Sequence, residues 1–314
     1  MARPHFLDSA CVLRITRLLL LLGGAAFATR AAALSADARA GLLAIDPERI
    51  SEQQVRELLS LAPAPRVLLF KGSLGADMES FGAFLQGMGY PAARLRNPAT
   101  GRYSYSFRWD GCRCAECDAL AASVSPQVRS EGMGPMLVGH SGGGVTVGRI
   151  LQVLAADAAA PRLPFAATLG TGALLRWAPG FPGCAADVPM LGRVPASVVA
   201  FTGYRIAGDP FTSLLGFGDY RAAAGGNPPA RVRNVLLPSQ VSHVNAFEVD
   251  GYAEHPQLRA WIDAYQPGSD TPPPDVTGLD LSNLRHAADL WHSLKKHWAL
   301  QARQWAAQRA SGTD

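Results

Sequence analysis

The chain has 314 residues, of which 48% are hydrophobic and 17% charged. These proportions are typical of a globular protein and exclude a largely disordered one. The net charge is +4, but residues 1–33 alone hold four arginines and a single aspartate. The remainder is close to neutral, so we expect no nucleic-acid partner and no general attraction to polyanions.

Residues 1–33 have the features of a secretory signal peptide. Arg14 and Arg17 precede an apolar run at residues 18–28, which is far shorter than the ~20 residues needed to span a bilayer. Small residues suited to signal-peptidase cleavage follow this run. An uncleaved anchor and an organelle transit peptide are alternatives, but the uninterrupted leucines favour export to the periplasm or the exterior.

Four cysteines remain once this leader is removed: Cys112, Cys114, Cys117 and Cys184. An even number of cysteines in an oxidising compartment predicts two disulfides, and the sequence leaves all three pairings open. Zinc ligation by the cysteine cluster is a weaker alternative, because no second Cys-x-x-Cys and no histidine pair lies near it.

Short apolar runs alternate with helical patterns through the body of the chain. A Ser-x-x-Gln capping box at Ser51 opens one helix, a pattern containing Phe81 and Met88 predicts another, and residues 145–160 predict a buried third. Strands are predicted at residues 67–70, 92–95, 136–138, 165–169, 197–201 and 232–237. This alternation predicts an α/β fold with a mostly parallel sheet of about six strands and helices on both faces.

Two intervals depart from this alternation. Aromatic and polar residues alternate over residues 103–109, which predicts an edge hairpin with one buried face, or alternatively a loop that lines a substrate site. Residues 170–196 are rich in glycine and proline and carry several large apolar side chains. A connection of that length inside a compact domain predicts a cap or lid.

The C-terminal segment predicts a linker and a basic amphipathic helix. We place the catalytic domain at residues 34–266 and the segment at 267–314, where a proline-rich stretch precedes a helix at residues 281–310. Trp291, Trp298 and Trp305 are spaced by seven residues and fall near one face. That face could pack on the body, self-associate or lie on a membrane surface. We expect truncation after Pro267 to spare catalysis.

The candidate nucleophile is Ser141, in the sequence Gly-His-Ser-Gly-Gly at residues 139–143. A Gly-x-Ser-x-Gly pentad alone is weak evidence, but this one joins a predicted strand to a predicted helix. A sharp turn there would expose the serine hydroxyl, while the N–H of Gly142 at the start of the helix would face a developing oxyanion. A serine-capped glycine turn without chemistry is the alternative.

Over residues 66–265 the chain resembles the lipase and esterase branch of the α/β-hydrolase superfamily. The resemblance rests on the pentad, on the turn Lys71-Gly72-Ser73 after the first strand, on Gly208-Asp209-Pro210, and on His243 after the last strand. It implies the chain order serine, acid, histidine, and an oxyanion hole formed by the N–H groups of Gly142 and Ser73. Lipases often carry His-Gly where this chain has Lys71-Gly72.

The base and the acid of the predicted triad each have a competitor. His243 follows the last strand, whereas His255 is expected at the entrance of the next helix, and His140 is expected to face away. Asp209 follows a strand by a short turn and is favoured over Asp219 as the residue that orients the imidazole.

These residues predict a serine hydrolase that transfers an acyl group to water. We expect a small-molecule or lipid ester with an apolar acyl or aryl group as substrate, and the chemistry needs no cofactor or metal. A thioesterase, amidase or acyltransferase would use the same residues. A binding module on the same fold is the alternative from another class, and it would usually lack part of the triad.

Overall fold

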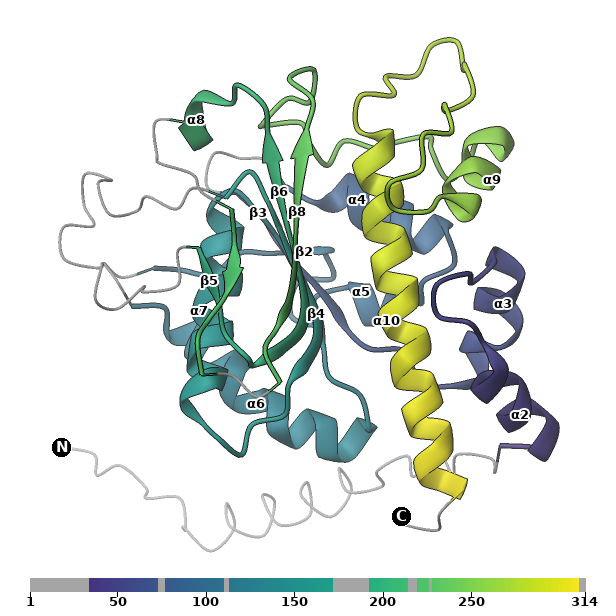
Figure 1. Ribbon diagram of the computed structural model, residues 1–314, viewed down its shortest axis with the longest axis vertical. Coiled ribbons are helices and arrows are strands. Elements are labelled where there is room, and N and C mark those ends of the chain that lie inside the picture. The colour runs from purple at the N-terminus through teal and green to yellow at the C-terminus, as the bar shows by residue number, and fades with distance from the viewer. Residues whose placement is uncertain are drawn as a thin grey trace, which may run out of the picture.

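The computed structural model describes residues 34–72, 77–109, 113–171, 192–213, 219–225 and 228–310. It confirms the predicted fold class, since the described residues form one parallel sheet in the order β2-β1-β3-β4-β6-β8 (Figure 1). The strands of this sheet are β1 (Val67–Phe70), β2 (Ser104–Tyr105), β3 (Met136–His140), β4 (Leu163–Leu169), β6 (Val198–Ile206) and β8 (Arg231–Leu237). A small second sheet pairs β5 (Arg193–Val194) with β7 (Arg221–Ala222).

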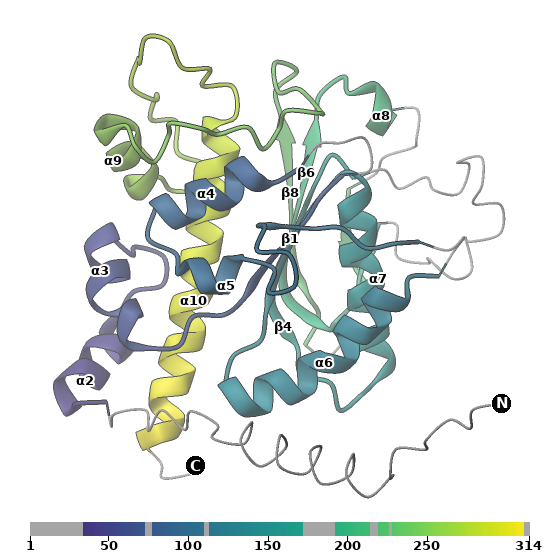
Figure 2. The ribbon, with the colours of Figure 1, turned by 180° about the vertical axis from the view of Figure 1, so that it is seen from behind.

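Helices cover both faces of the sheet (Figures 1 and 2). One face carries α2 (Ala36–Ala44), α3 (Glu52–Glu57), the 3-10 turn η1 (Leu59–Leu61), α4 (Glu79–Gly87), α5 (Ala92–Leu95), α9 (Pro256–Ala264) and α10 (Leu284–Ala310). The other face carries α6 (Ala115–Glu131) and α7 (Gly142–Ala156). A short α8 (Pro210–Ser213) follows β6.

The side chains of each strand alternate between two hydrophobic cores. In β1, Val67 and Leu69 belong to the core that includes α10, whereas Leu68 and Phe70 belong to the core that includes α6 and α7. All four residues are buried, which explains why the strand reads as a continuous apolar run and not as an alternating one. The same arrangement holds for the central strands β3 and β4.

Two of the predicted elements differ in the structure. The segment 92–95 is the helix α5 and not a strand, because it begins directly after Pro91 and consists of strong helix formers. Residues 104–105 do form an edge strand, but β2 pairs in parallel with β1, so the predicted hairpin is wrong. The capping box at Ser51 is present at the start of α3.

Helix α10 belongs to the larger of the two cores. Trp291, Trp298 and Trp305 are all buried, and Trp298 packs against Tyr90 with ring centroids 4.8 Å apart. Of the three alternatives for the tryptophan face (packing on the body, self-association and membrane binding), the structure shows packing on the body. The helix is therefore part of the same hydrophobic core as the body, and the domain boundary at residue 266 and the effect of truncation stay predictions.

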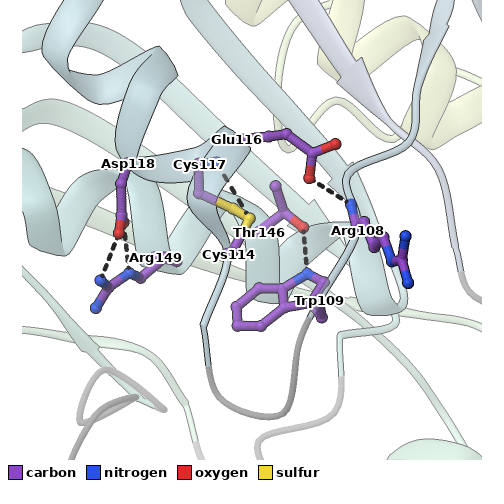
Figure 3. Close-up of a disulfide and its surroundings, with 8 residues drawn as sticks. All are labelled: Arg108, Trp109, Cys114, Glu116, Cys117, Asp118, Thr146 and Arg149. Carbon is purple, nitrogen blue, oxygen red and sulfur yellow. Dashed lines mark hydrogen bonds and ion pairs between the residues drawn. A yellow bond between two sulfur atoms is a disulfide. The ribbon is translucent and has the colours of Figure 1, made fainter.

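Cys114 and Cys117 form a disulfide at the beginning of α6 (Figure 3). The Sγ atom of Cys114 accepts the backbone N–H of Cys117, so the bridge also caps the helix. Beside it, Arg149 of α7 makes two hydrogen bonds to Asp118 of α6, at 2.9 and 3.1 Å. The two bonds of Arg149 connect α6 to α7, whereas the disulfide stabilises the start of α6 alone.

Several expectations concern residues that the structure does not describe. The leader at residues 1–33, the oxyanion residue Ser73, Cys112, Cys184 and most of the predicted lid at residues 170–196 lie outside the described ranges. Among the helices that are described, none has the length and apolar character required to cross a bilayer.

Candidate active site

Ser141 lies at the sharp turn between β3 and α7. Its φ of 49° is the one positive value found for a non-glycine residue in the described ranges, and its ψ is −120°. Its backbone N–H donates to the carbonyl of Leu169 at the end of the neighbouring strand β4, at 2.9 Å. Because an L residue pays a conformational cost in this region, the surrounding structure must hold the serine in place.

The glycines around Ser141 allow the turn to pack closely. A Cβ atom built on Gly143 would collide with the backbone carbonyl of Phe70, and one on Gly139 would lie 2.6 Å from the carbonyl oxygen of Gly143. The first turn of α7 therefore lies directly against the carboxyl end of β1. A larger residue at either position would push the serine away from the edge of the sheet.

The imidazole of His243 lies between the serine and a carboxylate. Its Nε2 is 3.0 Å from Ser141 Oγ, and its Nδ1 is 2.7 Å from Asp209 Oδ2. A carboxylate only accepts hydrogen bonds, so Nδ1 carries the ring proton and donates it. Nε2 then has a free lone pair that accepts the serine hydroxyl. The structure thus brings together the three residues that the sequence proposed as a triad.

Asp209 is held in the turn between β6 and α8. Its side chain is 1% exposed, and its Oδ1 accepts the backbone N–H of Phe211 at 2.9 Å. The two competitors lie elsewhere. Asp219 forms an ion pair with Arg205 at 2.8 Å and is half exposed, and His255 precedes α9.

Two neighbours that sequence reasoning missed pack against the imidazole of His243. Gly170, directly after β4, has a φ of 59°, and a Cβ atom there would lie 3.0 Å from the ring. The ring of Phe211 also packs against it in a tilted arrangement, with its centroid 4.7 Å from that of His243. Phe211 is 43% exposed and Val244, which follows His243 in the chain, is 45% exposed, whereas most large apolar side chains of the described residues are buried.

His140 does not face away from the site, contrary to the expectation from sequence. It is 1% exposed, and its Nε2 is 2.7 Å from the backbone carbonyl oxygen of His243. Burial lowers the pKa of His140 from 6.5 to about 4. Alternation along β3 could have revealed this, since residues 136, 138 and 140 share one face of the strand.

Of the two expected oxyanion donors, the structure describes Gly142 but not Ser73. Gly142 is the first residue of α7, so its N–H has no acceptor within the helix, and it lies at the positive end of the helix dipole. Gly72, the residue before Ser73, lies against the nucleophile, because a Cβ atom there would be 3.2 Å from Ser141 Cβ. Ser73 itself lies outside the described residues.

Within the described ranges no group of histidine, cysteine and acidic side chains has the arrangement of a metal site. Cys114 and Cys117 are joined to each other, and the remaining members of the cysteine set fall outside those ranges. The described residues therefore give no support to zinc ligation by the cysteines.

Comparison with known proteins yields distant similarities. No family of known proteins matches the sequence, and no curated protein does. Among solved structures, the chain is similar to RedJ with a PEG molecule bound in its active site, at 15% identity and a TM-score of 0.32, over 64% of this chain and 91% of that one. It is also similar to a protein described as a "putative cell surface hydrolase" from Lactobacillus plantarum WCFS1, at 12% identity and a TM-score of 0.31, over 56% and 81%.

Proposed function

We propose that the protein is a serine hydrolase that cleaves carboxylic esters through an acyl-enzyme. Its support is one geometric observation, the pair of hydrogen bonds that connects Ser141, His243 and Asp209. In this mechanism the hydroxyl of Ser141 attacks the ester carbonyl while His243 Nε2 takes its proton. The same nitrogen then protonates the leaving alcohol, and a water molecule repeats the sequence to release the acid.

Asp209 and the helix start supply the electrostatic part of the proposal. The carboxylate of Asp209 holds the imidazole in the required tautomer and stabilises its cationic form. The N–H groups of Gly142 and Ser73 receive the oxyanion, each worth about 3 kcal/mol in comparable sites. The role of Ser73 rests on the family resemblance alone.

The exposed apolar side chains beside His243 support an apolar acyl or aryl substrate. Five large hydrophobic residues are exposed among those described; one of them, Phe211, packs against this imidazole, and another, Val244, follows His243 in the chain. An acyl chain that covers them during binding would gain about 25 cal/mol per Å² of apolar surface removed from water. The arrangement favours a lipid-like ester over a strongly polar one.

Export is part of the proposal. The apolar leader at residues 18–28 supports it, as does the disulfide between Cys114 and Cys117, because disulfides persist mainly in oxidising compartments. We propose a periplasmic or secreted enzyme.

A panel of p-nitrophenyl esters of increasing acyl length tests the activity and the substrate class. We expect hydrolysis that rises with acyl length and that disappears in a folded Ser141→Ala variant. Phe211→Ala should reduce the preference for long acyl groups. Leu61→Ala, which removes an exposed side chain outside the site, is the matched control.

Activity that persists unchanged in Ser141→Ala would refute the assignment of the nucleophile. A folded wild-type protein that hydrolyses no oxygen ester and no thioester would favour the non-catalytic binding module instead. Turnover of thioesters alone would keep the mechanism and change the substrate class.

A further inference from the structure

His140 occupies a position from which it contacts both halves of the proposed catalytic pair. It is the last residue of β3 and directly precedes Ser141. Its ring lies on the α10 side of the sheet, edge-on to Phe247 with centroids 5.4 Å apart. A residue in this place can connect the serine turn to whatever segment carries the base.

The contact that does so is a hydrogen bond to main chain. Nε2 of His140 lies 2.7 Å from the carbonyl oxygen of His243. A carbonyl oxygen only accepts, so this ring nitrogen carries the proton and donates it. Nδ1 is buried without a partner among the described residues, and a Cβ atom on Gly72 would lie 3.2 Å from it. The ring is therefore enclosed, with its one donor directed at the backbone of His243.

The path of the chain explains why a hydrogen bond between His140 and the backbone of His243 affects the site. Ser141 follows β3, whereas His243 belongs to the connection after β8, and β4 and β6 lie between these two strands in the sheet. The connection must therefore cross the carboxyl ends of two strands before it reaches the serine. Asp209, Gly170 and Phe211 all contact the imidazole of His243, but the bond from His140 holds the backbone that carries it.

We propose that His140 is a positioning residue, which ties the backbone of His243 to the serine turn and so sets the distance between Ser141 Oγ and His243 Nε2. This inference rests on the proposed function and adds to it a residue that the triad does not contain. It assigns His140 no contact with substrate. A displacement of the base by about 1 Å can reduce the rate by a factor of about 100. We expect a loss of this size when the hydrogen bond from His140 is removed.

Three variants test this role: His140→Phe keeps the ring and removes the donor, His140→Gln restores a donor, and His297→Phe is the control. His297 is likewise buried and bonds a backbone carbonyl at 2.7 Å, but that carbonyl belongs to Ser293 on α10. Each variant is treated with excess fluorophosphonate until labelling stops, and the amount of label bound gives the fraction of chains whose Ser141 can react. The labelling rate, kcat per labelled site and KM are then measured.

We expect His140→Phe to label slowly and to lose about 100-fold in kcat per site with little change in KM. His140→Gln should recover most of the rate, and His297→Phe should lose stability but keep its kcat per site. Wild-type kcat per site in His140→Phe would overturn the inference, as would equal impairment of His140→Phe and His140→Gln. A folded wild-type protein that neither labels nor turns over esters would instead refute the proposed function itself.

Discussion

Asp209 and Asp219 allow a direct comparison at the scale of single residues. Both follow β6, but only the carboxylate of Asp209 is buried against His243, at 2.7 Å, while Asp219 pairs with Arg205 at the surface. We expect Asp209→Asn to reduce kcat by about 10⁴, because the amide no longer enforces the tautomer that the serine needs. Asp219→Asn should leave kcat near the wild-type value. Equal effects of the two substitutions on ester hydrolysis would contradict the assignment.

Gly170 and Gly101 provide a second matched pair. Both have positive φ, of 59° and 73°, but a Cβ atom on Gly170 would lie 3.0 Å from the imidazole of His243, whereas one on Gly101 would meet nothing within 4 Å. Substitution by alanine strains the backbone at both positions. Only Gly170→Ala should displace the base and slow fluorophosphonate labelling, by about 100-fold. Similar labelling rates in the two folded variants would show that this close contact has no effect on the site.

Only some of the residues of the candidate site can be predicted from the sequence. Ser141, Asp209 and His243 each end or follow a strand, and the carboxyl ends of parallel strands meet at one edge, so their proximity follows from chain order. The orientation of His140 is predicted wrongly because the second position of the Gly-x-Ser-x-Gly pentad can hold any residue, so the motif assigns it no role. The contact between Gly170 and His243 joins two separate loops, and no local pattern in the sequence reports such a contact.

At the scale of elements, the disulfide at the start of α6 can be tested without structural methods. Arg113 separates Cys112 from Cys114, so trypsin without reductant should release residues 114–129 as one peptide, two hydrogens lighter than its reduced form. Cys112 and Cys184 would then be left to pair with each other. A covalent link between the peptide that contains Cys112 and residues 114–129 would contradict the pairing.

Strands are predicted correctly from runs of large apolar residues, whereas the short segment of alanine, arginine and leucine at residues 92–95 leads to a wrong prediction. The strands β1 and β4 are recognisable in the sequence as runs of mainly apolar residues. The segment of α5 is four residues long, too short to distinguish helical from extended periodicity. The tryptophans of α10 predicted an apolar face correctly, but only tertiary packing could decide that the body of the protein covers it.

For the whole molecule, four buried histidines with lowered pKa values (His140, His286, His292 and His297) predict sensitivity to mild acid. Burial lowers the pKa values of His140, His286 and His297 from 6.5 to about 4. Between these values the unfolded chain binds more protons than the folded one, so the free energy of unfolding falls as the pH drops from 6.5 towards 4. The full contribution is present above pH 6.5. Urea unfolding over this pH range measures the effect.

His297→Phe serves as the control for this pH dependence. The ring of His297 stacks on Phe165 with centroids 4.9 Å apart, and phenylalanine can occupy the same place without titrating. We expect the variant to lose less stability than the wild type between pH 6.5 and pH 4, because one of these buried histidines is no longer present to take up a proton. A wild-type stability that is constant over this range would contradict the prediction.

The assignment of Ser141 as an activated nucleophile can be tested by identifying the residue that a fluorophosphonate modifies. The folded full-length protein is labelled, digested and analysed by mass spectrometry, with Ser141→Ala treated in parallel. We expect one adduct per chain, located on Ser141, and no adduct in the folded variant. An unmodified wild-type protein, or an adduct on another residue, would contradict it.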